Sequence, residues 1–181
     1  MGDITALLQA SADGDTEARN RVFELVYAEL RTIAARSARK VGGAGTLDTT
    51  GLVHECYLRL AGAEVNTRGH FFALATTAMR QILCDHARRR TAQKRGAGAR
   101  AASIEPDDIA VSESAAEELV MLDQLLGKLS LEDERAARVL EARVFGGLSV
   151  DETAEALGVS IRTVHNDTQR AKTWVASHWS A

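Results

Sequence analysis

The sequence predicts an all-α protein in which two small helical bundles are joined by a flexible acidic linker and the second bundle ends in a helix-turn-helix. Its 181 residues are 45% hydrophobic and include one proline and few aromatic side chains, a composition that favours packed helices. Apolar residues recur at helical spacing in several separate stretches, and no stretch alternates as a strand does. An irregular stretch over residues 96–112 divides the helical stretches into two groups.

The first group, residues 1–95, begins with two predicted helices. A short one covers residues 3–10, and Asp15 caps a longer one that continues to about Lys40, where a glycine-rich stretch ends it. The apolar stripe of the longer helix consists of Val22, Val26, Leu30 and Ile33. These residues are spaced by four, four and three positions, which places them on one helical face.

Two further helices complete this group. Thr50 is expected to cap a helix over residues 52–60, and a long helix is expected from about His70 to Arg90. The apolar side of the long helix consists of Phe71, Leu74, Ala78 and Ile82. We expect this side to pack against the rest of the first bundle.

The second group, residues 113–181, follows the predicted linker. The linker contains Gly96, Gly98 and Pro106 without a sustained period. The first apolar stripe after it consists of Leu119, Leu122, Leu126 and Leu129. Three more helices are then expected, over residues 133–145, from a Ser149 cap to Leu157, and from a Ser160 cap to about Ser177.

Charge is distributed unevenly along this chain, whose net charge is −3. Residues 80–100 carry seven basic side chains against one acidic one, whereas residues 101–160 carry four basic against fourteen acidic ones. The last helix is basic again. Two basic stretches around an acidic one indicate two contacts with a polyanion, although a single basic run would equally fit a solvated helix face.

The last two predicted helices have the spacing of a helix-turn-helix. Gly158 lies at the turn, where glycine adopts a positive φ most easily, and Val164 is expected to face the core. The second helix presents outward Arg162, Thr163, His165, Asn166, Arg170 and Lys172. Such a helix fits the major groove of DNA, where Asn pairs with adenine and Arg with guanine.

A helical hairpin used only for packing is the alternative to DNA binding. The basic outer face in an otherwise acidic half of the chain favours DNA. Asp167 on the same helix argues the other way, because an acidic residue there either orients a neighbouring arginine or repels DNA.

Several other classes of function lack support. No window of about 18 uncharged apolar residues predicts a membrane span, and the N-terminus lacks the basic start of a secretory signal. Cys56 and Cys84 are too few for a disulfide framework, which indicates the reducing cytoplasm.

Zinc binding by these cysteines is not expected either. Each cysteine lies two positions from a histidine on a helix, so the two side chains of each pair would point about 200° apart and cannot easily chelate zinc. No catalytic constellation or cofactor motif occurs, so no enzymatic activity, metal or cofactor is expected.

Three stretches carry motifs in a defined order. They are GLVHECYLRL at residues 51–60, HFFALATTAMRQILCDHARRRTAQKRG at residues 70–96 and FGGLSVDETAEALGVSIRTV at residues 145–164. With them, nearly the whole chain resembles an RNA polymerase sigma factor of the extracytoplasmic-function (ECF) group, in the branch with an HEAYLRL-type segment. Asp167 is also typical of that branch, and three ordered motifs are far more specific than a helix-turn-helix alone.

The resemblance implies a protein that binds core RNA polymerase, directs it to a subset of promoters and helps to open the DNA. Residues 1–95 would be sigma region 2, which recognises and melts the −10 element, and residues 113–181 would be region 4, which reads the −35 element. The −35 readers would be Arg162, Thr163, His165, Asn166, Arg170 and Lys172. The −10 residues would be Arg80, Gln81, Asp85, Arg88, Arg89, Arg90, Lys94 and Arg95. The core polymerase contact would be His54, Glu55, Leu58 and Arg59.

Melted bases need stacking surfaces. The aromatic side chains near the expected melting surface are Phe71 and Phe72, of which Phe71 is expected in the core. The tryptophan that the family often carries in this helix is missing here.

Two rival functions remain. The chain could be a stand-alone helix-turn-helix regulator whose first bundle senses a ligand or dimerises, or an interaction protein that sequesters a transcription partner. The basic strip over residues 80–95 argues against both, because neither needs a DNA-like surface there. The expected partners are core RNA polymerase and promoter DNA, and the free protein is expected to be a cytoplasmic monomer. The sequence does not decide whether an anti-sigma factor exists, or whether the two bundles of the free protein are loosely tethered or packed together.

Overall fold

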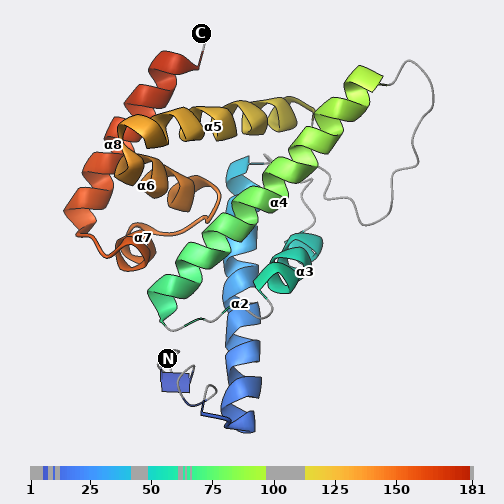
Figure 1. Ribbon diagram of the computed structural model, residues 1–181, viewed down its shortest axis with the longest axis vertical. Coiled ribbons are helices and arrows are strands. Elements are labelled where there is room, and N and C mark those ends of the chain that lie inside the picture. The colour runs from blue at the N-terminus through green and yellow to red at the C-terminus, as the bar shows by residue number, and fades with distance from the viewer. Residues whose placement is uncertain are drawn as a thin grey trace.

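The computed structural model describes residues 6–7, 10, 13–41, 49–60, 63, 65, 67–96 and 113–179. Within these residues the protein has seven helices of defined bounds and no strand, so the predicted all-α class is confirmed (Figure 1). None of the helices described is long and apolar enough to cross a bilayer. Most of the predicted helix over residues 3–10 lies outside the described residues, as do residues 97–112 of the predicted linker.

The N-terminal half contains three of these helices. They are α2 (Thr16–Val41), α3 (Thr49–Leu60) and α4 (Arg68–Gly96). Asp15 caps α2 as predicted, because its Oδ1 accepts hydrogen bonds from the backbone N–H groups of Glu17 at 2.9 Å and Ala18 at 3.1 Å. α3 begins at Thr49, one residue before its predicted cap, and α4 extends beyond both predicted ends.

The predicted apolar faces of these three helices meet in a core. Leu30 of α2, Leu52 of α3 and Met79 of α4 are fully buried, and each such side chain removed from water contributes about 1.5–3 kcal/mol. Phe71 and Phe72 are also buried, at 1% and 0% exposure. In this conformation, therefore, neither phenylalanine presents its ring to solvent for stacking on a base.

The C-terminal half contains the other four helices. They are α5 (Glu113–Glu132), α6 (Glu134–Val144), α7 (Val150–Leu157) and α8 (Ile161–His178). The predicted leucine stripe of α5 is buried at Leu119, Leu126 and Leu129. Asp133 caps α6, where its side chain accepts a hydrogen bond from the backbone N–H of Ala136 at 3.0 Å.

The pair α7 and α8 forms the predicted helix-turn-helix. Ser149 and Glu152 make a reciprocal capping box at the start of α7, which satisfies backbone donors that the helix cannot pair internally. Gly158 ends α7 with a φ of 64°, a left-handed conformation that glycine adopts without strain. Ser160 caps α8, and Val164 is fully buried as predicted.

The two halves pack directly against each other along α4. Both α5 and α7 lie against this helix (Figure 1), and buried side chains from both halves belong to one continuous hydrophobic cluster. Of the two arrangements that the sequence left open for the free chain, this conformation is the packed one.

Polar contacts reinforce this junction around α7. The Arg36 guanidinium of α2 pairs with the Glu152 carboxylate at 2.7 Å, and Arg68 of α4 pairs with Glu155 at 2.9 Å. Gly69 of α4 lies so close to α7 that a Cβ on it would be 2.8 Å from the Glu155 carbonyl oxygen. This approach between two helices is possible only because position 69 has no side chain.

Glu152 serves both the α7 cap and the junction, so its ionisation controls part of the stability of the packed form. Burial alone would raise the pKa of Glu152, but the Ser149 backbone N–H and the Arg36 guanidinium outweigh it and lower this pKa below its ordinary value. Because the pKa is lowered in the folded state, the stabilisation is present above the ordinary Glu pKa of about 4.3 and is lost as the pH falls through the folded value.

We therefore expect Glu152→Gln to lower the free energy of unfolding at pH 7 by about 1 kcal/mol, the size of a lost helix cap. The variant should also lose less stability than the wild type between about pH 5 and pH 3. Urea unfolding across this pH range measures both effects. Glu118→Gln, at an exposed position of α5, is the control and should behave as the wild type. Equal acid sensitivity of Glu152→Gln and the wild type would contradict this role.

Candidate nucleic-acid and partner surfaces

The predicted recognition face is present on α8. Arg162, His165, Asn166, Arg170 and Lys172 are all exposed. Thr163 is half-buried, and its hydroxyl lies 2.8 Å from that of Ser160, which also accepts a hydrogen bond from the Thr163 backbone N–H. Thr163 therefore belongs to the helix cap as well as to the outer surface, and the first turn of α8 presents backbone N–H groups suited to an anion.

Asp167 does not belong to the outer face, because its side chain is fully buried. Its carboxylate accepts a hydrogen bond from Arg135 Nε of α6 at 2.6 Å and pairs with Arg170 Nη2 at 2.8 Å. Of the two roles considered for this acidic residue, orienting a neighbouring arginine is therefore the one that the geometry supports. Two guanidinium groups are held at the surface by one buried charge.

Arg135 is a candidate surface residue that the sequence analysis missed. Its side chain is 54% exposed beside α8, while its Nε is fixed by Asp167. Asp133, the α6 cap, accepts a further hydrogen bond from Arg170 at 2.7 Å. The backbone N–H of Ala136 and the Arg170 guanidinium lower the pKa of Asp133. No local spacing relates Arg135 to Asp167, 32 positions away, so only the fold could reveal this pair.

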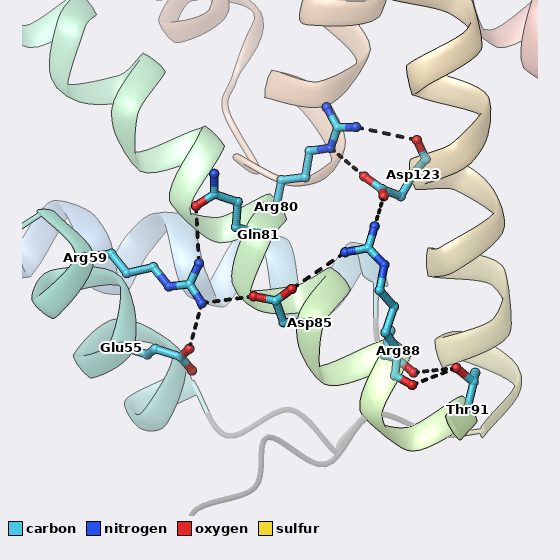
Figure 2. Close-up of polar contacts among 9 residues, drawn as sticks. Glu55, Arg59, Arg80, Gln81, Asp85, Arg88, Thr91 and Asp123 are labelled. Carbon is cyan, nitrogen blue, oxygen red and sulfur yellow. Dashed lines mark hydrogen bonds and ion pairs between the residues drawn. The ribbon is translucent and has the colours of Figure 1, made fainter. Parts of the chain in front are cut away.

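The second predicted surface lies on α4, where Figure 2 shows its polar contacts. Arg80 Nε donates to Asp123 Oδ1 of α5 at 2.7 Å, and Arg80 Nη1 lies 3.3 Å from Glu141 of α6. Arg88 pairs with the other carboxylate oxygen of Asp123. Burial would lower the pKa of Arg80, but its hydrogen bonds to Asp123 and Glu141 raise it, so this guanidinium stays charged. The two arginines are thus bound by carboxylates of the C-terminal half.

The other predicted members of this surface differ in their surroundings. Gln81 and Arg89 are exposed, and Asp85 is half-buried between Arg59 and Arg88. The side chains of Arg90, Lys94 and Arg95 lie outside the part of the structure that is described.

The third predicted surface, on α3, is connected to α4 by the same polar network. Arg59 contacts Glu55 at 3.2 Å, Asp85 at 3.1 Å and Gln81 Oε1 at 3.2 Å (Figure 2). Glu55 also lies 3.0 Å from Nε2 of His86.

Leu58 of α3 is not part of this network, and its side chain is 57% exposed. His54 is exposed as well.

The two cysteines are buried directly beneath these surfaces, Cys84 beside Asp123 and Cys56 near Arg59 and Glu55. Burial raises the pKa of Cys56 and of Cys84 to about 12 in each case, so both remain thiols at neutral pH. Among the described residues, no group of three His, Cys, Asp or Glu side chains is arranged to hold a metal ion.

A family model described as ECF sigma factor matches residues 1–181, the full length of the chain. The chain belongs to the ECF sigma factor family. It is accordingly a sigma factor, a DNA-binding protein of transcription initiation, and its family is a class of non-enzymatic factors. Neither the curated proteins nor the solved structures yielded a match.

For this sigma factor, family membership allows the exposed basic face of α8 to be interpreted as part of a DNA-binding motif, which the helix alone would not. The exposed basic face belongs to the helix-turn-helix of a DNA-binding protein, and RNA polymerase and promoter DNA are the partners that the family implies. The same membership makes the charged strip of α4 a candidate nucleic-acid surface.

Asp167→Asn is expected to destabilise the C-terminal half, because Arg135 and Arg170 lose the buried charge that fixes them. Charge-assisted hydrogen bonds are the stronger ones in proteins, so the thermal midpoint should fall by roughly 4 °C. Differential scanning calorimetry measures this shift. Asp151→Asn, at an exposed position in the first turn of α7, is the matched control. A midpoint unchanged in Asp167→Asn would show that the carboxylate does not hold the two arginines.

Proposed function

We propose that this ECF sigma factor binds core RNA polymerase and confers promoter choice on it. In this proposal residues 1–95 are region 2, residues 96–112 are the linker and residues 113–181 are region 4. The observation that carries the proposal is the exposed basic face of α8 in a chain that matches the family over its whole length. The polymerase supplies the chemistry, and the sigma factor acts by binding in the cytoplasm, where the polymerase is.

Reading of the −35 element is assigned to α8. Arg162, His165 and Asn166 are exposed near the N-terminal end of the helix, the part that reaches base edges in a helix-turn-helix. Arg170 and Lys172 lie further along and suit phosphates, as does Arg135 of α6. Thr163 is assigned to the same surface through its hydroxyl, which lies beside that of Ser160 at the capped helix start.

Recognition and melting of the −10 element are assigned to α4. The residues in this role are Arg80, Gln81, Asp85, Arg88, Arg89, Arg90, Lys94 and Arg95. Basic side chains along one helix follow a nucleic-acid backbone, and a polar side chain such as Gln81 can contact an unpaired base.

Binding to core polymerase is assigned to α3, through His54, Glu55, Leu58 and Arg59. Leu58 is the clearest single contact, because an aliphatic side chain that is 57% exposed gains free energy when a partner covers it. Around it, the other three residues supply a polar rim of the kind found at protein interfaces. We propose that the free protein is a monomer, and that any anti-sigma factor would compete for these surfaces.

The first experiment is a pull-down of bacterial core polymerase with the purified chain, followed by run-off transcription on host genomic fragments. Polymerase binding with new, specific start sites is the expected result. If the chain instead bound specific duplexes but no polymerase, it would be a stand-alone regulator, and the assignment of α3 would be wrong.

Arg162→Glu should weaken binding to the −35 duplex identified from those start sites by roughly tenfold or more, since a base-contacting arginine contributes about 1–3 kcal/mol. Arg162→Glu combined with Lys172→Glu, at another exposed position of α8, should weaken it further. Fluorescence anisotropy at fixed salt measures the duplex affinity, and co-elution measures polymerase binding, which should persist. Lys128→Glu on the exposed surface of α5 applies the same charge change elsewhere. If Lys128→Glu and Arg162→Glu lost equal duplex affinity, the loss would reflect the net charge of the protein and not a contact made by α8.

Leu58→Asp should weaken core polymerase binding by roughly 10- to 100-fold, because it places a charge where the polymerase would bury an apolar side chain. Because Leu58 is exposed and this substitution removes none of the ion pairs of Glu55 and Arg59, the fold should be preserved. Leu131→Asp, at an exposed leucine of α5, is the matched control. Undiminished polymerase binding by Leu58→Asp would move the interface away from α3.

A further inference from the structure

We propose that the free sigma factor is autoinhibited: its C-terminal half engages two arginines of the nucleic-acid surface of α4, with Asp123 as the latch. The proposal rests on the function assigned to α4 above. It adds a state in which that surface is occupied by the chain itself, and it identifies the contacts that hold the state closed.

The latch is one carboxylate that binds two arginines of the promoter surface. Arg80 and Arg88 are eight positions apart on α4, so they lie on the same helical face. Each engages a different oxygen of Asp123, whose side chain is only 13% exposed. Glu141 adds a second carboxylate to Arg80 at 3.3 Å. Because Arg80 is 27% and Arg88 54% exposed, a phosphate can reach these guanidinium groups, but it must first displace the protein carboxylates that hold them.

The closed state also fixes the first helix of the helix-turn-helix. Arg36 and Arg68 of the N-terminal half hold Glu152 and Glu155 of α7, and Gly69 touches the α7 backbone. The names of the −10 and −35 elements give their positions along the promoter, which differ by about 25 base pairs, or about 85 Å along DNA at 3.4 Å per step. Because α4 and α7 are in contact, they cannot occupy both elements at once. The closed state is therefore incompatible with reading a whole promoter.

The polar network provides a path for release by the polymerase. Arg59, on the surface assigned to polymerase, contacts Asp85, and Asp85 lies 3.6 Å from Arg88. If a partner takes up Arg59, the Asp85 carboxylate loses that cation and becomes a stronger competitor for Arg88. Drawing Arg88 toward Asp85 removes one of the two guanidinium groups from Asp123 (Figure 2). Binding at α3 thus weakens the latch on the opposite side of α4.

The structure suggests an opening variant that leaves each half intact. Gly69→Ala places a Cβ 2.8 Å from the Glu155 carbonyl oxygen, and Asp123→Ala removes the latch. Both changes raise helix propensity, so α4 and α5 should still form, which circular dichroism checks. The matched control combines Gly127→Ala, where a Cβ meets nothing within 4 Å, with Glu118→Ala, an exposed carboxylate of the same helix.

Opening can be followed by energy transfer between two dyes. Thr32→Cys of α2 and Asp151→Cys of α7 are exposed positions, each close in sequence to a member of the Arg36–Glu152 pair. Cys84 is replaced by alanine in every labelled protein, because its thiol lies beside Asp123 and would become accessible when the halves separate; Cys56 is buried and will not take up dye. We expect high transfer efficiency in the wild type and the control, and a marked loss in the opening variant.

Exposure of the surface is measured by binding to a single-stranded oligothymidylate, which needs no promoter sequence. The opening variant should bind several-fold more tightly. Its dependence of log affinity on log salt should be steeper by about 1.4, since two freed arginines add two phosphate contacts at about 0.7 each for a single strand. A structural contact without an inhibitory role would not change this slope.

Two outcomes would overturn the proposal. One is unchanged energy transfer in the opening variant, which would mean that these contacts do not hold the halves together. The other is a loss of transfer with unchanged affinity and salt slope, which would mean that the arginines held by Asp123 do not bind nucleic acid. Neither readout contains polymerase, so a failure of polymerase binding counts against the proposed function separately.

Discussion

The arrangement of this sigma factor depends on the pairing of Asp123 with Arg80 and Arg88. Without a carboxylate at this position, the Arg80 guanidinium, which is 27% exposed, would face the C-terminal half with Glu141 as its remaining carboxylate partner among the described residues, which is costly. With it, α5 lies along α4, and buried residues of both halves join in one cluster. The junction is thus built from the residue types that sequence analysis assigns to DNA.

A second carboxylate, Asp167, organises the opposite surface in a comparable way. It is buried within the C-terminal half and fixes Arg135 and Arg170 at the edge of the recognition helix. The difference between the two acidic residues lies in where their partners originate. Asp167 binds arginines of its own half and so remains satisfied in any arrangement of the halves, whereas Asp123 depends on the other half for its pairing.

The secondary structure was largely predictable from local signals. Asp15, Ser149 and Ser160 cap helices as expected, and Gly158 makes the turn between α7 and α8. The outward face of α8 also followed from periodicity. What the sequence could not supply was contact between distant positions. Asp123 and Arg80 are 43 positions apart. Helical periodicity does not indicate which of the many charged side chains will form an ion pair across such a separation.

For the same reason the role of Asp167 was open until its burial was known. Phe71 of α4 was expected in the core and is buried there, whereas Phe72 was left open for stacking and is buried as well. The burial of Phe72 depends on helices that local pattern does not position. The family resemblance assigned the candidate surfaces to α3, α4 and α8, and the fold then showed which of their residues already have partners within the chain.

The ionic character of the junction has a consequence for its response to the surrounding solution. Partly exposed ion pairs weaken as ions screen them, over a Debye length of about 8 Å at physiological ionic strength. Phosphate contacts weaken with salt as well. In a closed chain the two effects oppose each other, because salt weakens the ion pairs that hold Arg80 and Arg88 and also weakens their contacts with phosphate. The affinity of a closed chain for nucleic acid therefore falls less steeply with rising ionic strength than that of an open chain.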